Sequence, residues 1–306
     1  MQKDDLLTIY ELRVEQPQDR AKIIELDLKQ ILGPSLSGFH FEEDFLFLFC
    51  INPTDLTPLY QKVPHLELKT QHLLRYSEWQ DGAGANPIFV GPLQIYPSTF
   101  KDAQADLLES PDPVFRSSPE VPPLSTSLGF TEILPPLYLD PGLAFGYGGH
   151  PTTQDSLLFL IKLFSPLNPK IPQKGLDLGT GTGVLALAAA RLGIQGILGV
   201  DHSHLAVEAA QKNVALNQLE ERVTIVRGLA AAYADFPADL VMANVPYFVH
   251  TEFLELRGYD NRQHLILSGL LHEEGEKFIT QLKERYCVEI LDQIRDDRWI
   301  SYLLQV

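Results

Sequence analysis

The sequence predicts an α/β protein whose second half forms an open, doubly wound, mostly parallel β-sheet, with a smaller α+β domain before it. One observation is that short apolar runs alternate with helical runs from about residue 131 onward: KGLDLG, VLALAAARLG, GILGVD, HLAVEAAQKNVALNQL, RVTIVRG and ADLVMANVPY. Parallel strands need helical crossovers, so this alternation is typical of a doubly wound sheet. The other observation is that residues 109–130 are rich in proline and serine without periodicity, which predicts a linker before a domain at residues 131–306.

Residues 1–108 predict the smaller domain. LLTIYELRVE has strand character, PQDRAKIIELDLKQILG has the spacing and terminal glycine of a helix, and GFHFEEDFLFLFC returns to a strand. PTDLTPLYQKV predicts a second helix, and IFVGPLQIYPS predicts a short hairpin bent at Gly91-Pro92. This order of strands and helices favours a ferredoxin-like arrangement.

Composition and charge restrict the function. With 45% apolar and 21% charged residues, the chain is predicted to be a soluble, cytoplasmic protein, and Arg191 and Gln195 interrupt its longest apolar stretch, which disfavours a membrane contact. Cys50 and Cys287 have no ligand spacing around them, so we assign no metal site. A net charge of -16 disfavours direct nucleic-acid binding and suits a basic protein partner.

The stretch GLDLGTGTGVLALAAA predicts a nucleotide-like binding turn between a strand and a helix. Gly179, Gly181 and Gly183 lie at the turn, where the absence of a Cβ lets the backbone approach a ligand at the helix N-terminus. The next strand ends at Asp201, whose carboxylate is expected to accept hydrogen bonds from both hydroxyls of a ribose.

Two features favour S-adenosylmethionine over NAD as the ligand. The glycine spacing is GxGxG rather than GxGxxG, and Asp177 precedes the first glycine by two residues. A carboxylate there suits the α-ammonium of a methionine moiety and would repel a pyrophosphate. A glycine turn that binds nothing is the alternative.

The stretch ADLVMANVPYFV predicts a second functional turn. A buried strand over residues 240–243 ends in Asn244, and Val245-Pro246 forces an extended turn. Such a turn could aim the Asn244 side-chain oxygen and the Val245 carbonyl at one point, where they would hold an acceptor NH₂ for in-line methyl transfer. Alternatively, Asn244 is a turn former followed by a structural proline.

Three other residues have competing interpretations. The ring of His150 braces the loop before a predicted helix, or acts as a base; we prefer the first. Tyr147 and Tyr247 are candidates for contact with the acceptor, since an aromatic face stabilises a sulfonium or methylated ammonium, or they fill apolar space.

Taken together, the stretches LDPGLAFGYGGHPTT, LDLGTGTGVLALAAARLG, GVDHSHLAVEAAQKNVALN, ADLVMANVPY, LILSGLL and DDRWISYLL resemble the PrmA-type methyltransferases of large-subunit ribosomal protein eleven. The resemblance runs from about Leu139 to the C-terminus. It implies a class I methyltransferase sheet of seven strands, S-adenosylmethionine as donor and N-methylation of a protein's amino groups. It also implies that the N-terminal domain recognises the substrate and that the loop before the first helix closes over the cofactor.

Carried over by position, the resemblance makes Thr153, Gly179, Asp201 and Asn244 cofactor contacts and Phe145 a wall of the pocket. This chain departs from the family pattern in two places. Residues 146–150 read Gly-Tyr-Gly-Gly-His instead of Gly-Thr-Gly-Thr-His, and residues 244–247 read Asn-Val-Pro-Tyr instead of Asn-Ile-Leu-Ala. The second departure approaches the Asn-Pro-Pro-Tyr motif of enzymes that methylate glutamine amides or adenine amines. A protein amine, a glutamine amide, a nucleobase or a small amine therefore remain open as acceptors, as does a binding protein without activity.

Overall fold

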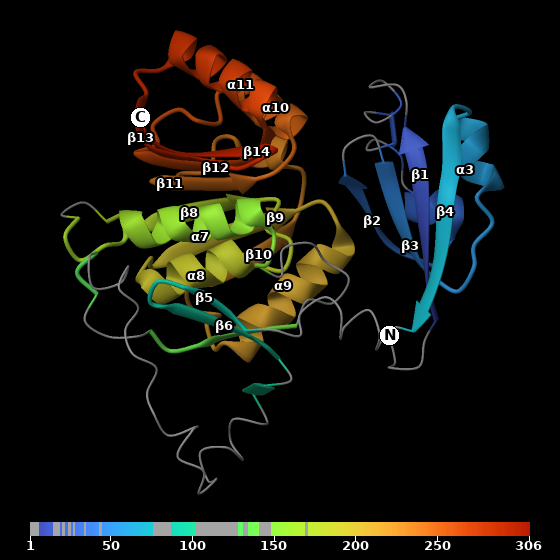
Figure 1. Cartoon of the computed structure of the whole chain (residues 1–306), viewed down its shortest axis with the longest axis horizontal. Helices are drawn as coiled ribbons and strands as arrows, with labels where there is room; N and C mark the ends of the chain where they lie inside the picture. The colour runs from blue at the N-terminus through green and yellow to red at the C-terminus, as the bar shows by residue number, and fades with distance from the viewer. Residues whose placement is uncertain are drawn as a thin grey trace, which may run out of the picture. The chain divides into compact units, whose positions relative to one another are not determined.

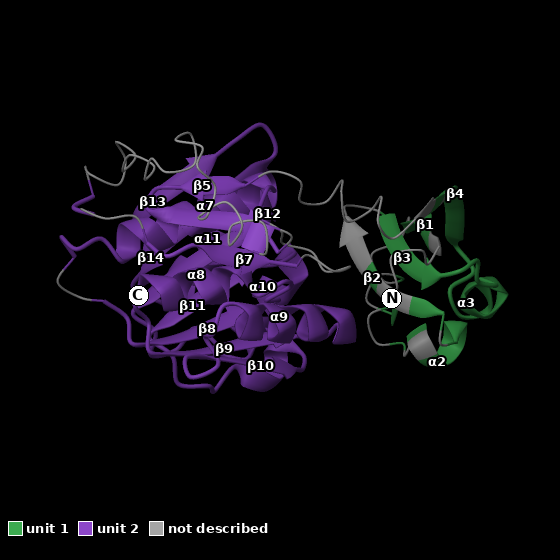
Figure 2. Ribbon diagram, turned by 90° about the horizontal axis from the view of Figure 1, so that it is seen from below, with its two compact units in different colours: residues 1–85 green, residues 86–306 purple. Residues whose placement is uncertain are grey.

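The chain divides into two compact units, residues 1–85 and 86–306, which Figure 2 shows in green and purple. The structure, a computed structural model, describes residues 6–14, 19, 22–23, 26, 28–33, 35–42, 45–75, 87–98, 100–101, 128–130, 134–140, 148–168 and 171–306. No helix in these described ranges is both long enough and apolar enough to cross a membrane.

The first unit is a four-stranded antiparallel sheet with the strand order β2-β3-β1-β4. Its described elements are β1 (Leu6–Val14), α2 (Leu28–Leu32), β2 (Leu36–Glu42), β3 (Phe45–Ile51), α3 (Thr57–Lys62) and β4 (Leu66–Arg75). Leu12, Leu48 and Leu59 come from two strands and a helix and are fully buried in one apolar cluster. The element order and the strand order are those of a ferredoxin-like unit, so this predicted arrangement is confirmed.

Two elements of the first unit differ from the prediction. GFHFEEDFLFLFC forms two strands, β2 and β3, which pair as an antiparallel hairpin, rather than one strand. The closing strand of the unit is β4, which the sequence did not predict. Its apolar residues do not mark one buried face, because Leu68 and Leu73 remain 42% and 54% exposed.

The predicted hairpin forms, but it belongs to the second unit. It consists of β5 (Ile88–Val90) and β6 (Leu93–Pro97), and β6 pairs in parallel with β7 (Leu137–Leu139). Ile95 is fully buried in the core of the second unit. Strand pairing and a shared core therefore place the division before residue 86 instead of after residue 108. Most of the predicted linker lies outside the described residues.

The second unit contains the predicted seven-stranded sheet, with the order β10-β9-β8-β11-β12-β14-β13 (Figure 1). The first five strands in this order are parallel, whereas β14 is antiparallel to both of its neighbours. The strands are β8 (Lys174–Leu178), β9 (Gly196–Asp201), β10 (Val223–Arg227), β11 (Leu240–Asn244), β12 (His264–Leu271), β13 (Glu289–Arg295) and β14 (Trp299–Gln305). Strand order reverses between β8 and β11, the point where doubly wound sheets bind ligands.

Helices cover both faces of this sheet, as Figure 1 shows. One face packs against α7 (Pro151–Leu163), α8 (Val184–Leu192) and α9 (His204–Leu216), and the other against α10 (Tyr247–Glu255) and α11 (His272–Arg285). Along β11, Leu240 and Met242 join the first apolar cluster, while Val241 and Ala243 join the second. Successive strand residues point to opposite faces, so a sheet covered on both sides requires continuously apolar strands.

Two asparagines anchor the backbone at residues 138–140: Asn213 of α9 and Asn217, which caps the C-terminus of this helix. Asn217 Oδ1 accepts from the Tyr138 N–H (2.8 Å) and its Nδ2 donates to the Tyr138 carbonyl (2.7 Å). Asn213 pairs in the same way with Asp140 (2.7 and 2.9 Å) and also donates to the Thr182 carbonyl (3.0 Å). Asn213 therefore ties residue 140 to the glycine-rich turn that precedes α8.

Replacing Asn213 by alanine is expected to lower the free energy of unfolding by about 2 to 4 kcal/mol. The change leaves a buried N–H and two buried carbonyls without their partner, which costs more than the lost hydrogen bonds alone. Urea unfolding followed by circular dichroism measures this loss. The matched control is Glu220→Ala at an exposed position after α9, for which we expect a change within about 0.5 kcal/mol. Equal losses in the two variants would contradict the anchoring role.

Candidate functional site

The predicted site residues gather at the carboxyl edge of the parallel strands. β8, β9 and β11 are neighbours in the sheet and end at Leu178, Asp201 and Asn244. Parallel strands present their carboxyl ends at one edge, so the turns that follow β8 and β11 lie side by side. The structure thus brings the glycine turn, Asp201 and Asn244 to one place.

The glycine turn is folded tightly against two neighbouring segments. The N–H groups of Gly179 and Thr180 both donate to the Val200 carbonyl at the end of β9 (2.8 and 3.0 Å). Gly179 has φ +68°, and a Cβ there would lie 2.4 Å from Val245 Cγ1. Both the backbone conformation and the close approach therefore require glycine at position 179.

Asp201 is joined directly to this turn. Its side-chain oxygens accept hydrogen bonds from the backbone N–H groups of Gly181 (Oδ2, 3.0 Å) and Ser203 (Oδ1, 2.9 Å), and the residue is 8% exposed. Each carboxylate oxygen can accept a further hydrogen bond, because each has two lone pairs. Asp201 is thereby held in one orientation with acceptor capacity left for hydroxyl groups, as the predicted ribose contact needs.

Asp177 lies buried beneath the turn. Its Oδ2 accepts from the Thr180 hydroxyl (2.7 Å) and from the Ala186 N–H (3.2 Å), whereas no described residue donates to Oδ1. Burial raises the pKa of Asp177 to about 7, an effect that the hydrogen bonds from Thr180 and Ala186 oppose and the charge of Asp201 reinforces. A cation against this carboxylate would favour its ionised form and lower the pKa.

The side chain of Asn244 is held by helix α7. Asn244 Nδ2 donates to the hydroxyl oxygen of Thr153 (3.2 Å), a residue that is 1% exposed. This hydrogen bond occupies an amide donor and leaves Oδ1 as an acceptor. Thr153 and Asn244, which were predicted separately as cofactor contacts, are therefore joined by a hydrogen bond.

The Val245 backbone lies against the neighbouring strand β12. Its N–H donates to the Ser268 carbonyl of β12 (3.2 Å), and its carbonyl oxygen would lie 2.7 Å from a Cβ at Gly269, where φ is +78°. The Val245 carbonyl therefore lies close to β12, and the expectation that it shares one target with the Asn244 oxygen stays a prediction.

The two remaining candidates in the described residues are held by neighbouring helices. Tyr247 begins α10, donates its hydroxyl to Gln281 Oε1 of α11 (3.2 Å) and sets its ring edge-on to Phe278. This placement supports the alternative of a packing role, and the acceptor contact of Tyr247 stays a prediction. His150 caps α7, where its Nδ1 lies 2.7 Å from the Thr152 hydroxyl, as the bracing interpretation expects. Phe145 and Tyr147 lie outside the described residues.

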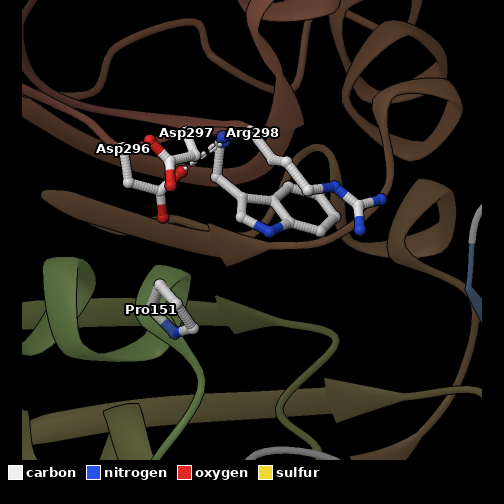
Figure 3. A pocket seen from close by; sticks show the side chains of 5 residues that line it. Pro151, Asp296, Asp297 and Arg298 are labelled. Carbon is white, nitrogen blue, oxygen red and sulfur yellow. Dashed lines mark hydrogen bonds between the residues drawn. The ribbon is translucent and has the colours of Figure 1, made fainter.

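A hollow of about 310 Å³ at the same edge was not predicted. It is lined by Pro151, the first residue of α7, and by Asp296, Asp297, Arg298 and Trp299 at the turn into β14 (Figure 3). Trp299 pairs with Leu271 at the carboxyl end of β12, and its ring lies edge-on to His150 (centroids 5.4 Å apart). The hollow is formed by segments about 145 residues apart, so its lining could not be read from the sequence. The local feature that could have indicated it is Trp299, an aromatic residue directly after a turn.

Comparison with known proteins gives one consistent family. The family model described as "Ribosomal protein L11 methyltransferase (PrmA)" matches residues 134–305. A ribosomal protein L11 methyltransferase of Thermotoga neapolitana is 34% identical over 169 residues, covering 55% of this chain and 61% of the relative. One of Lactobacillus gasseri is 36% identical over 168 residues, covering 54% and 51%. The matched region thus spans little more than half the length of these curated relatives.

A solved structure extends the likeness. The crystal structure of a ribosomal protein L11 methylase from Lactobacillus delbrueckii subsp. bulgaricus has a TM-score of 0.53 and 26% sequence identity, and the match covers 72% of this chain and 98% of that one. The fold class predicted from the sequence, a class I methyltransferase sheet, agrees with this neighbour and with the observed strand order. Because the family model covers more than half of its residues, this chain belongs to the ribosomal protein L11 methyltransferase (PrmA) family.

Proposed function

We propose that the chain is an S-adenosylmethionine-dependent N-methyltransferase that acts on amino groups of a protein, a ribosomal protein in particular. The observation that carries the proposal is that the turn after Asn244 packs against the glycine turn through Val245, while the amide donor of Asn244 is fixed by Thr153. A donor-binding turn and an acceptor-orienting group at one sheet edge are what methyl transfer requires.

The chemistry of the site fits S-adenosylmethionine. Asp201 offers its two fixed oxygens to ribose hydroxyls, and Asp177 offers a buried carboxylate to the methionine ammonium. Residues 175–190 contain no lysine or arginine that could pair with a phosphate. When bound, S-adenosylmethionine supplies a methyl group carried on a sulfonium. Gly179 and Gly181 would allow the backbone to approach it, and Thr153 and Asn244 would contact it.

Asn244 would orient the acceptor amine. Its Oδ1 accepts a hydrogen bond from an amine N–H, which turns the nitrogen lone pair towards the donor. A protonated amine must lose a proton before it attacks. His150 is committed to the α7 cap through Nδ1, so the proton passes to water in this proposal.

The substrate assignment follows from the family and from charge. The matched relatives are named for ribosomal protein L11, and a chain with a net charge of -16 attracts a basic protein. We propose that the enzyme works in the cytoplasm on such a protein, without direct contact to nucleic acid or membrane, and that the ferredoxin-like unit recognises the substrate.

Methyl transfer from labelled donor to fractionated cell material tests the acceptor class. We expect label in the ribosomal protein fraction, and amino-acid analysis should identify methylated lysine or a methylated terminal amine. The turn Asn244-Val245-Pro246-Tyr247 favours one competitor, a planar NH₂ of a glutamine amide or a nucleobase. Label on glutamine or RNA would show that this competitor is the acceptor. Label on small metabolites would show that the acceptor is a small amine. If the protein binds the donor but no fraction becomes labelled, the proposed methyltransferase activity is refuted.

Replacing Asn244 by alanine is expected to lower kcat for methyl transfer by roughly 100-fold while the Kd for S-adenosylmethionine changes by less than about threefold. Loss of the orienting oxygen misplaces the amine without removing the ribose and ammonium contacts. Single-turnover kinetics and calorimetry measure the two quantities. Gln293→Ala, an exposed amide on β13, is the control and should match the wild type. An unchanged kcat in Asn244→Ala would refute the role of this residue.

The affinity for S-adenosylmethionine is expected to rise with pH between about pH 5.5 and 7. The pKa of Asp177 is raised to about 7 in the free protein, so the carboxyl is neutral below that pH and must ionise to pair with an ammonium. Binding therefore releases a proton, and the Kd should tighten by up to about tenfold per pH unit in this window. Calorimetry in buffers of different ionisation enthalpy detects the released proton.

The control for this pH dependence is a pair of carboxyl-to-amide variants. Asp177→Asn should abolish the dependence and weaken binding at pH 7, whereas Asp235→Asn, at an exposed position, should leave it intact. A wild-type Kd that does not vary with pH would show that the Asp177 carboxyl does not meet the ammonium.

A further inference from the structure

His250 is a polar residue buried in the middle of the second unit. It lies on α10, six residues after Asn244, and it is fully buried. Its Nε2 is 3.0 Å from the Ser268 carbonyl oxygen and its Nδ1 is 3.2 Å from the Tyr259 hydroxyl. The Phe278 ring packs beside it, with centroids 5.3 Å apart. Both ring nitrogens therefore have partners in a setting from which water is excluded.

These partners decide the protonation state of the ring. A carbonyl oxygen only accepts, so Nε2 carries the proton and donates to Ser268, while Nδ1 accepts from the Tyr259 hydroxyl. Burial lowers the pKa of His250 to about 4, although its hydrogen bonds to the backbone of Ser268 and Val245 oppose the shift. The ring is thus neutral at physiological pH and serves as a fixed donor, not as a proton carrier.

Ser268 is the residue through which His250 reaches the site. It lies opposite Asn244 in the parallel register of β11 and β12, and its carbonyl accepts from the Val245 N–H as well as from His250. Its hydroxyl donates to the Thr152 carbonyl (3.1 Å) and lies 2.8 Å from the Ser301 hydroxyl. One buried serine therefore connects the acceptor turn to α7, α10 and β14.

Ser268 is also linked to the side chain of Asn244, through α7. Thr152 is followed by Thr153, whose hydroxyl holds the Asn244 carboxamide. The backbone after Asn244 is fixed by Ser268, and the side chain of Asn244 is fixed by the helix that Ser268 also binds. A displacement of the Ser268 carbonyl would therefore move the Asn244 backbone and its side-chain support together.

We propose that His250 is a positioning residue for methyl transfer, and that its Nε2–H holds the Ser268 carbonyl in the place that orients the Asn244 carboxamide towards the acceptor. This inference rests on the proposed function of the same site. It assigns different tasks to the two ends of the ring: the bond to Ser268 sets the geometry of the acceptor turn, and the bond to Tyr259 contributes to stability.

Variants that break one bond at a time test the assignment. His250→Asn shortens the side chain and removes the donor to Ser268, so kcat should fall at least about tenfold with the donor Kd within about threefold. His250→Gln can place an amide N–H near the position of Nε2 and should recover kcat to within about threefold of the wild type. Tyr259→Phe keeps the Ser268 bond and should lower the unfolding midpoint while kcat stays within about twofold.

A spectroscopic signature accompanies the kinetics. The side-chain NH₂ resonances of Asn244 in a ¹H–¹⁵N spectrum should shift in His250→Asn and keep their wild-type positions in Tyr259→Phe. This measurement needs no turnover, so it decides the inference even where the acceptor is not known.

The outcomes separate the two proposals. Equal losses of kcat in His250→Asn and Tyr259→Phe, or unmoved Asn244 resonances in His250→Asn, would reduce His250 to a packing residue and leave the methyltransferase intact. A wild-type protein that methylates no fraction, with Asn244 resonances that still depend on His250, would refute the proposed function and leave the support of the turn standing.

Discussion

The close approach of Gly179 to Val245 is the contact on which the candidate site depends. β8 and β11 are neighbours in the sheet, so the turns that follow them meet at one edge. A Cβ on Gly179 would stand 2.4 Å from Val245 Cγ1, and only glycine lets the two turns pack together. In-line transfer, the proposed reaction, needs donor and acceptor held within about 0.5 Å of the productive geometry, and this contact brings together the two turns that would hold them.

The residues that hold Val245 in this contact are mostly polar and buried. Gly269 gives the Val245 carbonyl room, while Ser268 binds the Val245 N–H, the His250 ring and the Thr152 carbonyl. Hydrogen bonds in a low-dielectric interior are strong, and a network whose members are paired is rigid. The acceptor turn is therefore held by the core of the sheet rather than by surface contacts, which suits a group that must orient a nucleophile.

The departure from the family pattern at residues 244–247 keeps Asn244 and changes the residues that follow it. Pro246 has φ -60° and ψ 153° and caps α10, where its missing N–H costs no helical hydrogen bond. α10 therefore begins three residues after Asn244, which directs Tyr247 to α11 and His250 to β12.

The sequence by itself determined the doubly wound sheet, the glycine turn and the strand-end positions of Asp201 and Asn244, because apolar periodicity and glycine placement are local properties of the chain. It misplaced residues 88–97 and missed β4, since strand membership depends on pairing with distant segments. Only the tertiary structure decided that Thr153 holds Asn244 across 91 residues, and that His250 and Ser268 secure the turn. Such hydrogen bonds arise from the order in which strands lie side by side, and no local pattern encodes that order.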